Sequence, residues 1–294
     1  MSISRARFSL LPAVLSVSTA SIFVRYAAAP PMGAAFWRSA VAGIVLLGVF
    51  LFPVYRREFR SVSWSRMGTI ALATVIISVH QICFITSLSL TSIAASTFLT
   101  STQPVWTALL GGWLIRERVS LRAFLALGGA LAGMAIITLS KPTESALWGN
   151  LLAVAAAILA SLYSLAARKL RQSTPIVSFM VVVNVSSAIF LGILGLILGT
   201  NLGDYSDKTW LGLILLGLLP TLVGHSLLTY AIGHLRAFVV NASILGEPVG
   251  ATILAAIFFK EFPTVQTLIG GAIVIICILF IVFEREIPPT GEQT

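Results

Sequence analysis

Long apolar segments separated by short polar connections dominate the pattern along the chain. Uncharged runs cover residues 8–24, 39–55, 69–115, 123–140, 145–167, 172–203, 209–235 and 262–283. A helix that crosses a bilayer needs about 20 apolar residues, and the run 69–115 is long enough for two such helices. Residues 237–259 form a further segment that only Glu247 interrupts. The pattern therefore predicts ten membrane-spanning helices, near residues 8–27, 34–53, 68–88, 93–115, 120–140, 146–168, 175–199, 209–231, 237–259 and 264–283.

The composition supports the same class of protein. The chain has 294 residues, of which 57% are hydrophobic and 10% are charged, and its mean hydropathy is +1.00. A soluble protein carries about 25% charged residues. An all-α integral membrane protein follows, because so much apolar surface cannot be hidden from water and the short connections leave no room for a soluble domain.

The net charge of +9 indicates orientation rather than a nucleic-acid partner. If the N-terminus is cytoplasmic, fourteen arginines and lysines fall on the cytoplasmic side of the predicted spans. Only Lys141, Lys208 and Lys260 fall clearly outside. This asymmetry agrees with the positive-inside rule. It predicts a multi-pass protein of the bacterial inner (plasma) membrane with both termini in the cytoplasm.

The N-terminus also imitates a cleavable signal peptide. Two arginines precede an apolar run, which the small-residue stretch 27–29 follows. Such a pattern is typical of secretory signals. The run 8–24 is long for a signal core, and its removal would destroy the internal repeat described next. We therefore interpret it as the first span.

The two halves of the sequence resemble each other. When the sequence is shifted by 144 positions, segment 101–120 lies over segment 245–264, and Gln103-Pro104-Val105 coincides with Glu247-Pro248-Val249. The first spans of the two halves also match at a shift of 143, where Ser18, Ser21 and Arg25 lie over Ser161, Ser164 and Arg168. Single matches between apolar segments arise easily by chance, but several at nearly one offset indicate a duplication.

Each repeat unit contains five predicted helices, and an odd number makes the second copy enter the membrane from the opposite side. The sequence therefore predicts a 5+5 inverted-topology repeat around a central cavity. Its halves are 1–144 and 145–286, and a short tail, 287–294, follows. Such repeats are typical of secondary transporters, which bind substrate near the membrane midplane between the halves and rock around that site.

Pro104 and Pro248 occupy matching positions in the fourth and ninth predicted spans. Each removes one backbone hydrogen bond and is expected to kink its helix. Freed carbonyls at membrane depth are tolerated where they face protein or a watery cavity. Close packing against neighbouring helices also explains a single proline, whereas a symmetric pair favours a cavity.

The sequences QPVWTALLGGWLIRE and EPVGATILAAIFFKE, together with the ten spans, resemble the drug/metabolite transporter superfamily, specifically its ten-helix EamA exporters. The family's Pro-Val pair and terminal glutamate correspond to Pro104, Val105 and Glu117, and then to Pro248, Val249 and Glu261. The resemblance covers nearly the whole chain and implies export of amino acids, related metabolites or toxic compounds. The YddG-type aromatic amino acid exporters have a similar span layout.

Glu247 is the strongest candidate for a transport residue. An acidic residue at the centre of a membrane helix costs roughly 2.5–3.5 kcal/mol on insertion scales, so its presence suggests a function. Its carboxyl group could bind a proton or the ammonium group of a substrate. The alternative is a structural carboxylate that an arginine such as Arg25 or Arg38 neutralises, or one that stays protonated.

Other polar residues lie within predicted spans. His80 and Gln81 lie in the middle of span three, and His225 aligns with Gln81 in the repeat. Gln103 and Ser243 lie on polar faces of spans four and nine. Such residues line a cavity or join helices by hydrogen bonds. Gln103, beside a proline, is the better cavity candidate, and a histidine satisfied by a neighbouring helix is the ordinary alternative for His80.

Three aromatic residues lie deep in predicted spans: Trp37, Trp106 and Tyr163. Each could stack on an apolar substrate or cap an ammonium group by a cation–π contact, worth about 0.5–2 kcal/mol. Lipid-facing packing is the alternative for the two tryptophans. Tyr163 lies within the repeated Ser161–Ser164 turn, which favours the cavity.

Few residues suit other functions. The three histidines and two cysteines show no metal-binding spacing, and Cys83 and Cys277 lie within spans and form no disulfide framework. No nucleophile elbow or HExxH motif is found, so neither an enzyme nor a bound cofactor is expected. The sequence predicts a carrier, monomeric or homodimeric, that exports aromatic or neutral amino acids and related amines by alternating access, with protons as a further partner. Broad efflux of drugs or organic cations is the alternative, ahead of a nucleotide-sugar-type carrier or a channel.

Overall fold

The computed structural model describes residues 2–49, 51–60, 64–90, 93–114, 120–139, 147–260 and 265–283. Within these ranges the chain is helical, without strands. The first half contains α1 (Ser2–Phe8), α2 (Leu10–Val17), α3 (Ala20–Ala27), α4 (Pro31–Val49), α5 (Pro53–Arg60), α6 (Trp64–Leu90), α7 (Ile93–Thr100), α8 (Gln103–Leu114) and α9 (Leu121–Leu139). The second half contains α10 (Leu147–Arg171), α11 (Ile176–Ile197), α12 (Asp207–Leu216), η1 (Gly217–Gly224), α13 (His225–Ile232), α14 (Ala237–Ser243), η2 (Ile244–Gly246), α15 (Glu247–Phe259) and α16 (Val265–Phe283).

Each predicted span lies on one helix or on a continuous run of helices. Seven of these, among the described residues, are long and apolar enough to cross a membrane: Ile3–Ala27, Pro31–Val49, Met67–Leu90, Leu147–Arg171, Ile176–Ile197, Asp207–Ile232 and Ala237–Phe258. Shorter apolar stretches occur in α9 and α16, at Leu121–Gly133 and Leu268–Cys277. A turn divides the remaining predicted span into α7 and α8. An all-helical membrane protein is confirmed, and the total of ten crossings stays a prediction.

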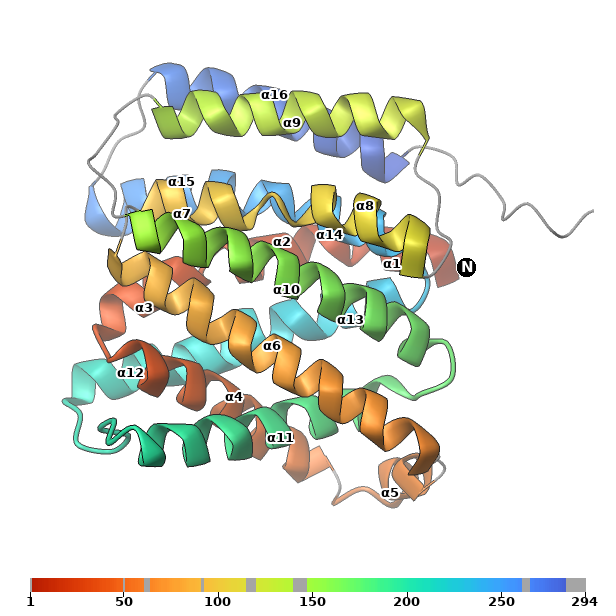
Figure 1. The fold of residues 1–294 in the computed structure, drawn as a ribbon, viewed down its shortest axis with the longest axis vertical. Coiled ribbons are helices and arrows are strands. Elements are labelled where there is room, and N and C mark those ends of the chain that lie inside the picture. Colours follow the sequence, from red (N-terminus) through yellow and green to blue (C-terminus); the bar gives the residue numbers. More distant parts are fainter. Residues whose placement is uncertain are drawn as a thin grey trace, which may run out of the picture.

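The helices lie side by side along one common direction (Figure 1). The most extensive contacts join the first half of the chain to the second: α6 packs on α10, α9 on α16, and α4 on α11. The α2–α3 segment packs on the α12–η1–α13 segment, and α8 packs on α14. The two halves are therefore interleaved, and each buries its apolar faces mainly against the other.

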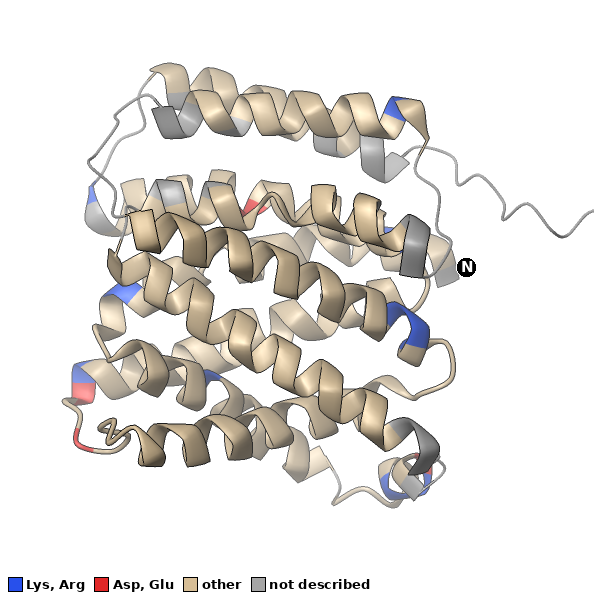
Figure 2. Ribbon diagram, viewed as in Figure 1, with Lys and Arg blue, Asp and Glu red and all other residues tan. Residues whose placement is uncertain are grey.

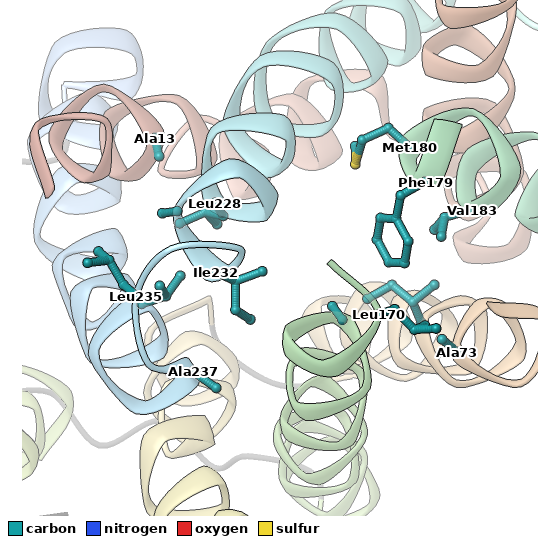
Figure 3. Close-up of a cluster of buried hydrophobic side chains, with 14 of the residues drawn as sticks. Ala13, Ala73, Leu170, Phe179, Met180, Val183, Leu228, Ile232, Leu235 and Ala237 are labelled. Carbon is teal, nitrogen blue, oxygen red and sulfur yellow. The ribbon is translucent and has the colours of Figure 1, made fainter. Parts of the chain in front are cut away.

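A large hydrophobic cluster holds the ends of several helices together (Figure 3). Leu170 of α10 and Phe179 of α11 lie across from Ile232 of α13. Phe179 is fully buried, and van der Waals packing of this kind is what holds helices together within a membrane. This cluster fixes the helix ends that carry basic residues, while apolar side chains such as those of Ile193 and Ile276 remain exposed on the outside.

Charged residues avoid most of the helical surface (Figure 2). Most arginines and lysines, drawn in blue, lie at helix ends, and one acidic segment, drawn in red, lies midway along the line formed by α14 and α15. The N-terminus, α5 and the end of α10 lie at the same end of the bundle (Figure 1). This acidic segment in the middle of the bundle belongs to the site described next.

Candidate functional site

Two interrupted helices place the paired prolines. The helix ending at Ser243 passes through the 3₁₀ turn η2 and resumes as α15 at Glu247, with Pro248 in its first turn. The helix ending at Thr100 is likewise followed by a turn, and α8 begins at Gln103. A proline is tolerated in the first helical turn, because the missing N–H would have no partner there in any case. At each break, turn hydrogen bonds such as Val105 N–H to the carbonyl of Thr102 and Glu247 N–H to the carbonyl of Ile244 replace regular α-helical ones.

Arg38 of α4 reaches across to the second half. It is only 3% exposed. Its Nε donates a hydrogen bond to Oγ1 of Thr221 at 3.2 Å, and its Nη2 lies 3.2 Å from Nε2 of His225. Because an arginine only donates hydrogen bonds, Nε2 of His225 is the acceptor. The guanidinium is thus held in one orientation by two side chains of the helix run that contains η1.

The π-helical segment η1 explains why these two side chains point at Arg38. Pro220 lies inside it and cannot donate a backbone hydrogen bond, which favours a widened turn. Thr221 Oγ1 donates to the carbonyl of Leu216 at 2.8 Å, so its lone pairs remain available to Arg38. A Cβ atom added at Gly217 would lie 2.5 Å from Cβ of Val41. Only glycine allows η1 to approach α4 this closely.

Glu247 supplies the opposite charge. Its carboxylate interacts electrostatically with Arg38, and the side chain is partly buried. Among the described residues, no hydrogen bond or ion pair to this carboxylate is found. A carboxylate deep in a bundle is costly unless it is paired and hydrogen-bonded. Glu247 is therefore a carboxylate within the apolar bundle to which no described residue donates a hydrogen bond.

His80 and Gln81 of α6 border the same charge. Nδ1 of His80 lies 2.9 Å from the carbonyl of Ala156, and the ring stacks on Phe84 with an interplanar angle of 2°. His80 also interacts electrostatically with Arg38. Gln81 accepts a hydrogen bond at 3.1 Å from Ser39, the residue after Arg38. His80 and Gln81, both predicted to be transport residues, therefore lie on the Arg38 side of the site.

Gln103 belongs to a separate buried network. Its Nε2 donates to Oγ of Ser164 at 3.1 Å, and that hydroxyl donates to Oδ1 of Asn241 at 3.0 Å. Nδ2 of Asn241 in turn donates to Oγ1 of Thr107 at 2.7 Å. Ser161 donates to the carbonyl of Gln103 at 2.7 Å. The network links α8, α10 and α14, and every side chain in it is buried.

The other predicted residues lie elsewhere. Trp37 donates to the carbonyl of Leu202 at 2.6 Å, and its ring lies 4.6 Å from that of Trp210, so it packs beneath the loop before α12. The indole of Trp106 donates to Thr102 Oγ1 at 3.2 Å, across the turn between α7 and α8.

Tyr163 and Ser243 also have their own partners. The ring of Tyr163 lies 6.4 Å from that of Phe179 in the hydrophobic cluster. Ser243 is buried and donates to the carbonyl of Val240 at 2.6 Å. Neither shares a hydrogen bond with Arg38. Glu117 and Glu261 lie outside the described residues.

Sequence reasoning undervalued Arg38. It was predicted only as one of two cations that could neutralise Glu247, but the structure buries it and joins it by hydrogen bonds to Thr221 and His225. Arg25, the other candidate, is exposed. The available signal was a lone cation inside an apolar helix, because an arginine in that position is costly and therefore faces the interior of a bundle.

Comparison with known proteins places the chain in a family. The model of the EamA-like transporter family matches twice, over residues 5–139 and 147–283. The chain belongs to the EamA-like transporter family. It is a multi-pass membrane protein of the drug/metabolite transporter superfamily, and its family is one of transporters rather than enzymes.

Two curated relatives are similar along most of the chain. An uncharacterised transporter, YetK, of Bacillus subtilis (strain 168) is 27% identical over 224 residues, which cover 72% of this chain and 68% of the relative. An uncharacterised transporter of Helicobacter pylori (strain J99) is 26% identical over 230 residues, 76% of each protein. A solved crystal structure superposes with a TM-score of 0.78 at 19% identity, covering 96% of this chain and 98% of the other. That likeness supports the fold.

Proposed function

We propose that this protein of the EamA-like transporter family exports aromatic and neutral amino acids, and related small amines, across the bacterial inner membrane by alternating access. The observation that carries the proposal is the presence of two charged side chains within apolar helices: Arg38 is buried and hydrogen-bonded to Thr221 and His225, and Glu247 is partly buried at a helix break. A membrane protein retains such charges at a cost of several kcal/mol. Binding of a charged solute by these two side chains would explain why the protein retains them despite that cost.

The interleaved halves support an inverted repeat of five helices each. If the halves 1–144 and 145–286 are exchanged, the pairs α4–α11 and α9–α16 map onto themselves, and the pair α8–α14 maps onto the pair α15–α7, which is also in contact. The packing of α6 on α10 then corresponds to the packing of α12, η1 and α13 on the α2–α3 segment. A carrier of this kind opens alternately to each side when one set of helices rocks against the other.

The distribution of charge supports cytoplasmic termini. The basic residues at the ends of α1 and α10 lie at the same end of the bundle as α5 (Figure 2). Cysteines introduced at Gln172 and Ser206, both exposed, in a variant whose native cysteines are replaced, test this orientation. We expect an impermeant thiol reagent to reach position 206 from outside and position 172 only after permeabilisation. Labelling of both positions from one side would contradict the proposed topology.

Glu247 is proposed as the residue that meets the substrate's ammonium group or a coupling proton. Arg38 interacts electrostatically with Glu247, and His80 and His225 lie on the Arg38 side of the site. Gln81 and Ser39 line the side of the site formed by α6 and α4. Five further residues remain proposed transport residues and rank behind Glu247: Trp37, Gln103, Trp106, Tyr163 and Ser243.

Reconstitution into liposomes tests the function. Labelled phenylalanine, leucine, glutamate and an organic cation are followed with and without an imposed pH gradient. We expect saturable flux of phenylalanine and leucine that Glu247→Gln abolishes. Flux that doubles with an opposing pH gradient identifies proton antiport, and flux indifferent to it identifies facilitated diffusion. Absence of amino-acid flux, with flux of the cation intact, would favour efflux of organic cations instead.

A further inference from the structure

We propose that the short helix α5 lies in the headgroup layer of the membrane, at the end of the bundle where the N-terminus lies, and binds the phosphate groups of anionic phospholipids. Two of its arginines, Arg56 and Arg57, contact the phosphates, and the apolar side chains beside them enter the outer part of the acyl layer. This surface lies apart from the site around Arg38 and Glu247, and the inference holds whichever solute the protein carries.

The helix α5 runs across the direction of the spanning helices. The neighbouring helices α4, α6 and α11 extend along the bundle, whereas α5 is seen nearly end-on, beyond the end of α4 and before the start of α6 (Figure 1). It packs on α11. A helix with this orientation at the end of a spanning bundle lies in the plane of the interface, as amphipathic interfacial helices do.

The sequence of α5, PVYRREFR, separates the two arginines from the aromatic residues. At about 100° per residue, Arg56 and Arg57 lie on one side of the helix, and Tyr55, Glu58 and Phe59 lie on the other. Both arginine side chains are exposed, whereas the three on the opposite side are half-buried. The aromatic side therefore faces the protein, and the guanidinium groups point outward.

Exposed apolar side chains lie beside these arginines. Leu51, Phe52 and Val54 are 75%, 61% and 56% exposed. Such side chains are unfavourable in water, and an arginine is unfavourable in hydrocarbon. The boundary between headgroups and acyl chains satisfies both kinds of residue. There, phosphate oxygens can accept pairs of hydrogen bonds from a guanidinium group.

The corresponding connection in the second half has a different character. It joins α11 to α12 through residues 198–206, contains no helix, and carries Asp204 as its charged residue. The first-half connection has four arginines within residues 56–66. Clusters of about four to eight basic residues directly after a spanning helix are typical of segments that bind anionic lipids. Lipid binding at one end of the bundle accounts for this difference between the two connections.

Native mass spectrometry of the purified full chain tests the binding. The protein is titrated with phosphatidylglycerol, which is anionic, and with phosphatidylethanolamine, which has no net charge. We expect the wild type to bind phosphatidylglycerol at least about tenfold more tightly, since each arginine at a membrane surface contributes about fivefold. The double variant with Arg56→Gln and Arg57→Gln should lose this preference. The control, with Arg122→Gln and Lys169→Gln, removes two exposed cations from α9 and α10 and should keep it.

A fluorescent label measures where α5 lies. In a variant whose native cysteines are replaced, Val54→Cys or Gly203→Cys carries the label, and the protein is reconstituted into vesicles whose lipids bear a quenching nitroxide near the headgroup. Both positions are exposed, and a Cβ at Gly203 meets nothing within 4 Å. We expect the nitroxide to quench the label at position 54 and to leave the label at position 203 unaffected.

Three results would overturn the inference. One is equal affinity of the wild type for the two lipids, and another is a preference that both double variants lose equally, because the attraction would then belong to the whole charged end of the bundle. The third is an unquenched label at position 54, which would place α5 in water and favour an acidic soluble protein as its partner. Fluxes in liposomes decide the transport function separately from all three.

Discussion

The two proline turns occupy corresponding places in the two halves of the chain, but their surroundings differ. Gln103 donates a hydrogen bond to Ser164 within a buried chain of hydroxyl and amide groups. Glu247 has the same position in the second half and faces Arg38 without a hydrogen-bonded partner among the described residues. Gln103 is thus held by side-chain hydrogen bonds, whereas Glu247 has none among the described residues. The difference supports the proposal that Glu247, rather than Gln103, meets the transported molecule.

The residues near each turn repeat the contrast. Ser161 and Ser18, which correspond in the repeat, both donate to the carbonyl four residues earlier. Ser164 then joins the Gln103 network, whereas the matching Ser21 is buried with no hydrogen-bond partner for its hydroxyl. A buried hydroxyl without a partner costs about 1–3 kcal/mol. Thr100, at the end of α7 beside the Gln103 turn, also has a buried hydroxyl without a hydrogen-bond partner, so the contrast concerns the matched serines and not every group at the two turns.

Glu247→Gln gives the largest expected effect. The amide keeps the shape and removes the charge, so flux of phenylalanine in liposomes should fall at least about 100-fold, which corresponds to roughly 2.7 kcal/mol. Thermal unfolding in detergent should change little, because no hydrogen bond to the carboxylate is lost among the described residues. The reciprocal variant Gln103→Glu added to it should not restore flux, since no arginine was found beside Gln103. Restored flux would show that the two turns are interchangeable.

Gly217→Val tests the support of Arg38. The new Cβ would lie 2.5 Å from Cβ of Val41 and 3.3 Å from the carbonyl of Arg38, so η1 must move away from α4. Overpacking of this kind costs about 1–3 kcal/mol. We expect phenylalanine to bind about tenfold more weakly, because Thr221 and His225 shift with η1. Gly128→Val is the control, since a Cβ there meets nothing within 4 Å, and equal effects of both variants would exclude this role of η1.

Gln103→Leu addresses the first of the two turns. It removes the donor to Ser164 and should lower the free energy of unfolding by about 1–3 kcal/mol. Flux per folded molecule should stay within about threefold of wild type, as an effect below roughly 0.7 kcal/mol. A decrease comparable to that of Glu247→Gln, with unchanged thermal stability, would instead make Gln103 a substrate ligand.

The helical architecture could be predicted from the sequence because long apolar runs have few alternatives in a membrane. The span boundaries follow the observed helices, and Glu247 was found from its charge alone. The partners of these residues could not be predicted in the same way. Arg38 contacts Thr221 because the π-helical segment η1, which contains Pro220, packs closely against α4 at Gly217. Hydropathy does not predict such a segment. The role of Gln103 could not be predicted either, because the sequence does not distinguish an amide in a buried hydrogen-bond network from an amide that lines a cavity.

Ser21→Ala and Ser164→Ala sharpen the comparison at its smallest scale. Alanine at position 164 leaves Gln103 and Asn241 without a shared partner and should cost about 1–3 kcal/mol of unfolding free energy. At position 21 the substitution removes a hydroxyl that has no partner, so stability should be unchanged or rise by up to about 1 kcal/mol. Both substitutions delete one buried oxygen atom at corresponding positions of the repeat. The loss of packing between helices should therefore be the same in the two variants. A cost at position 21 equal to that at position 164 would mean that the Ser21 hydroxyl has a partner in the membrane, and the difference between the two matched serines would disappear.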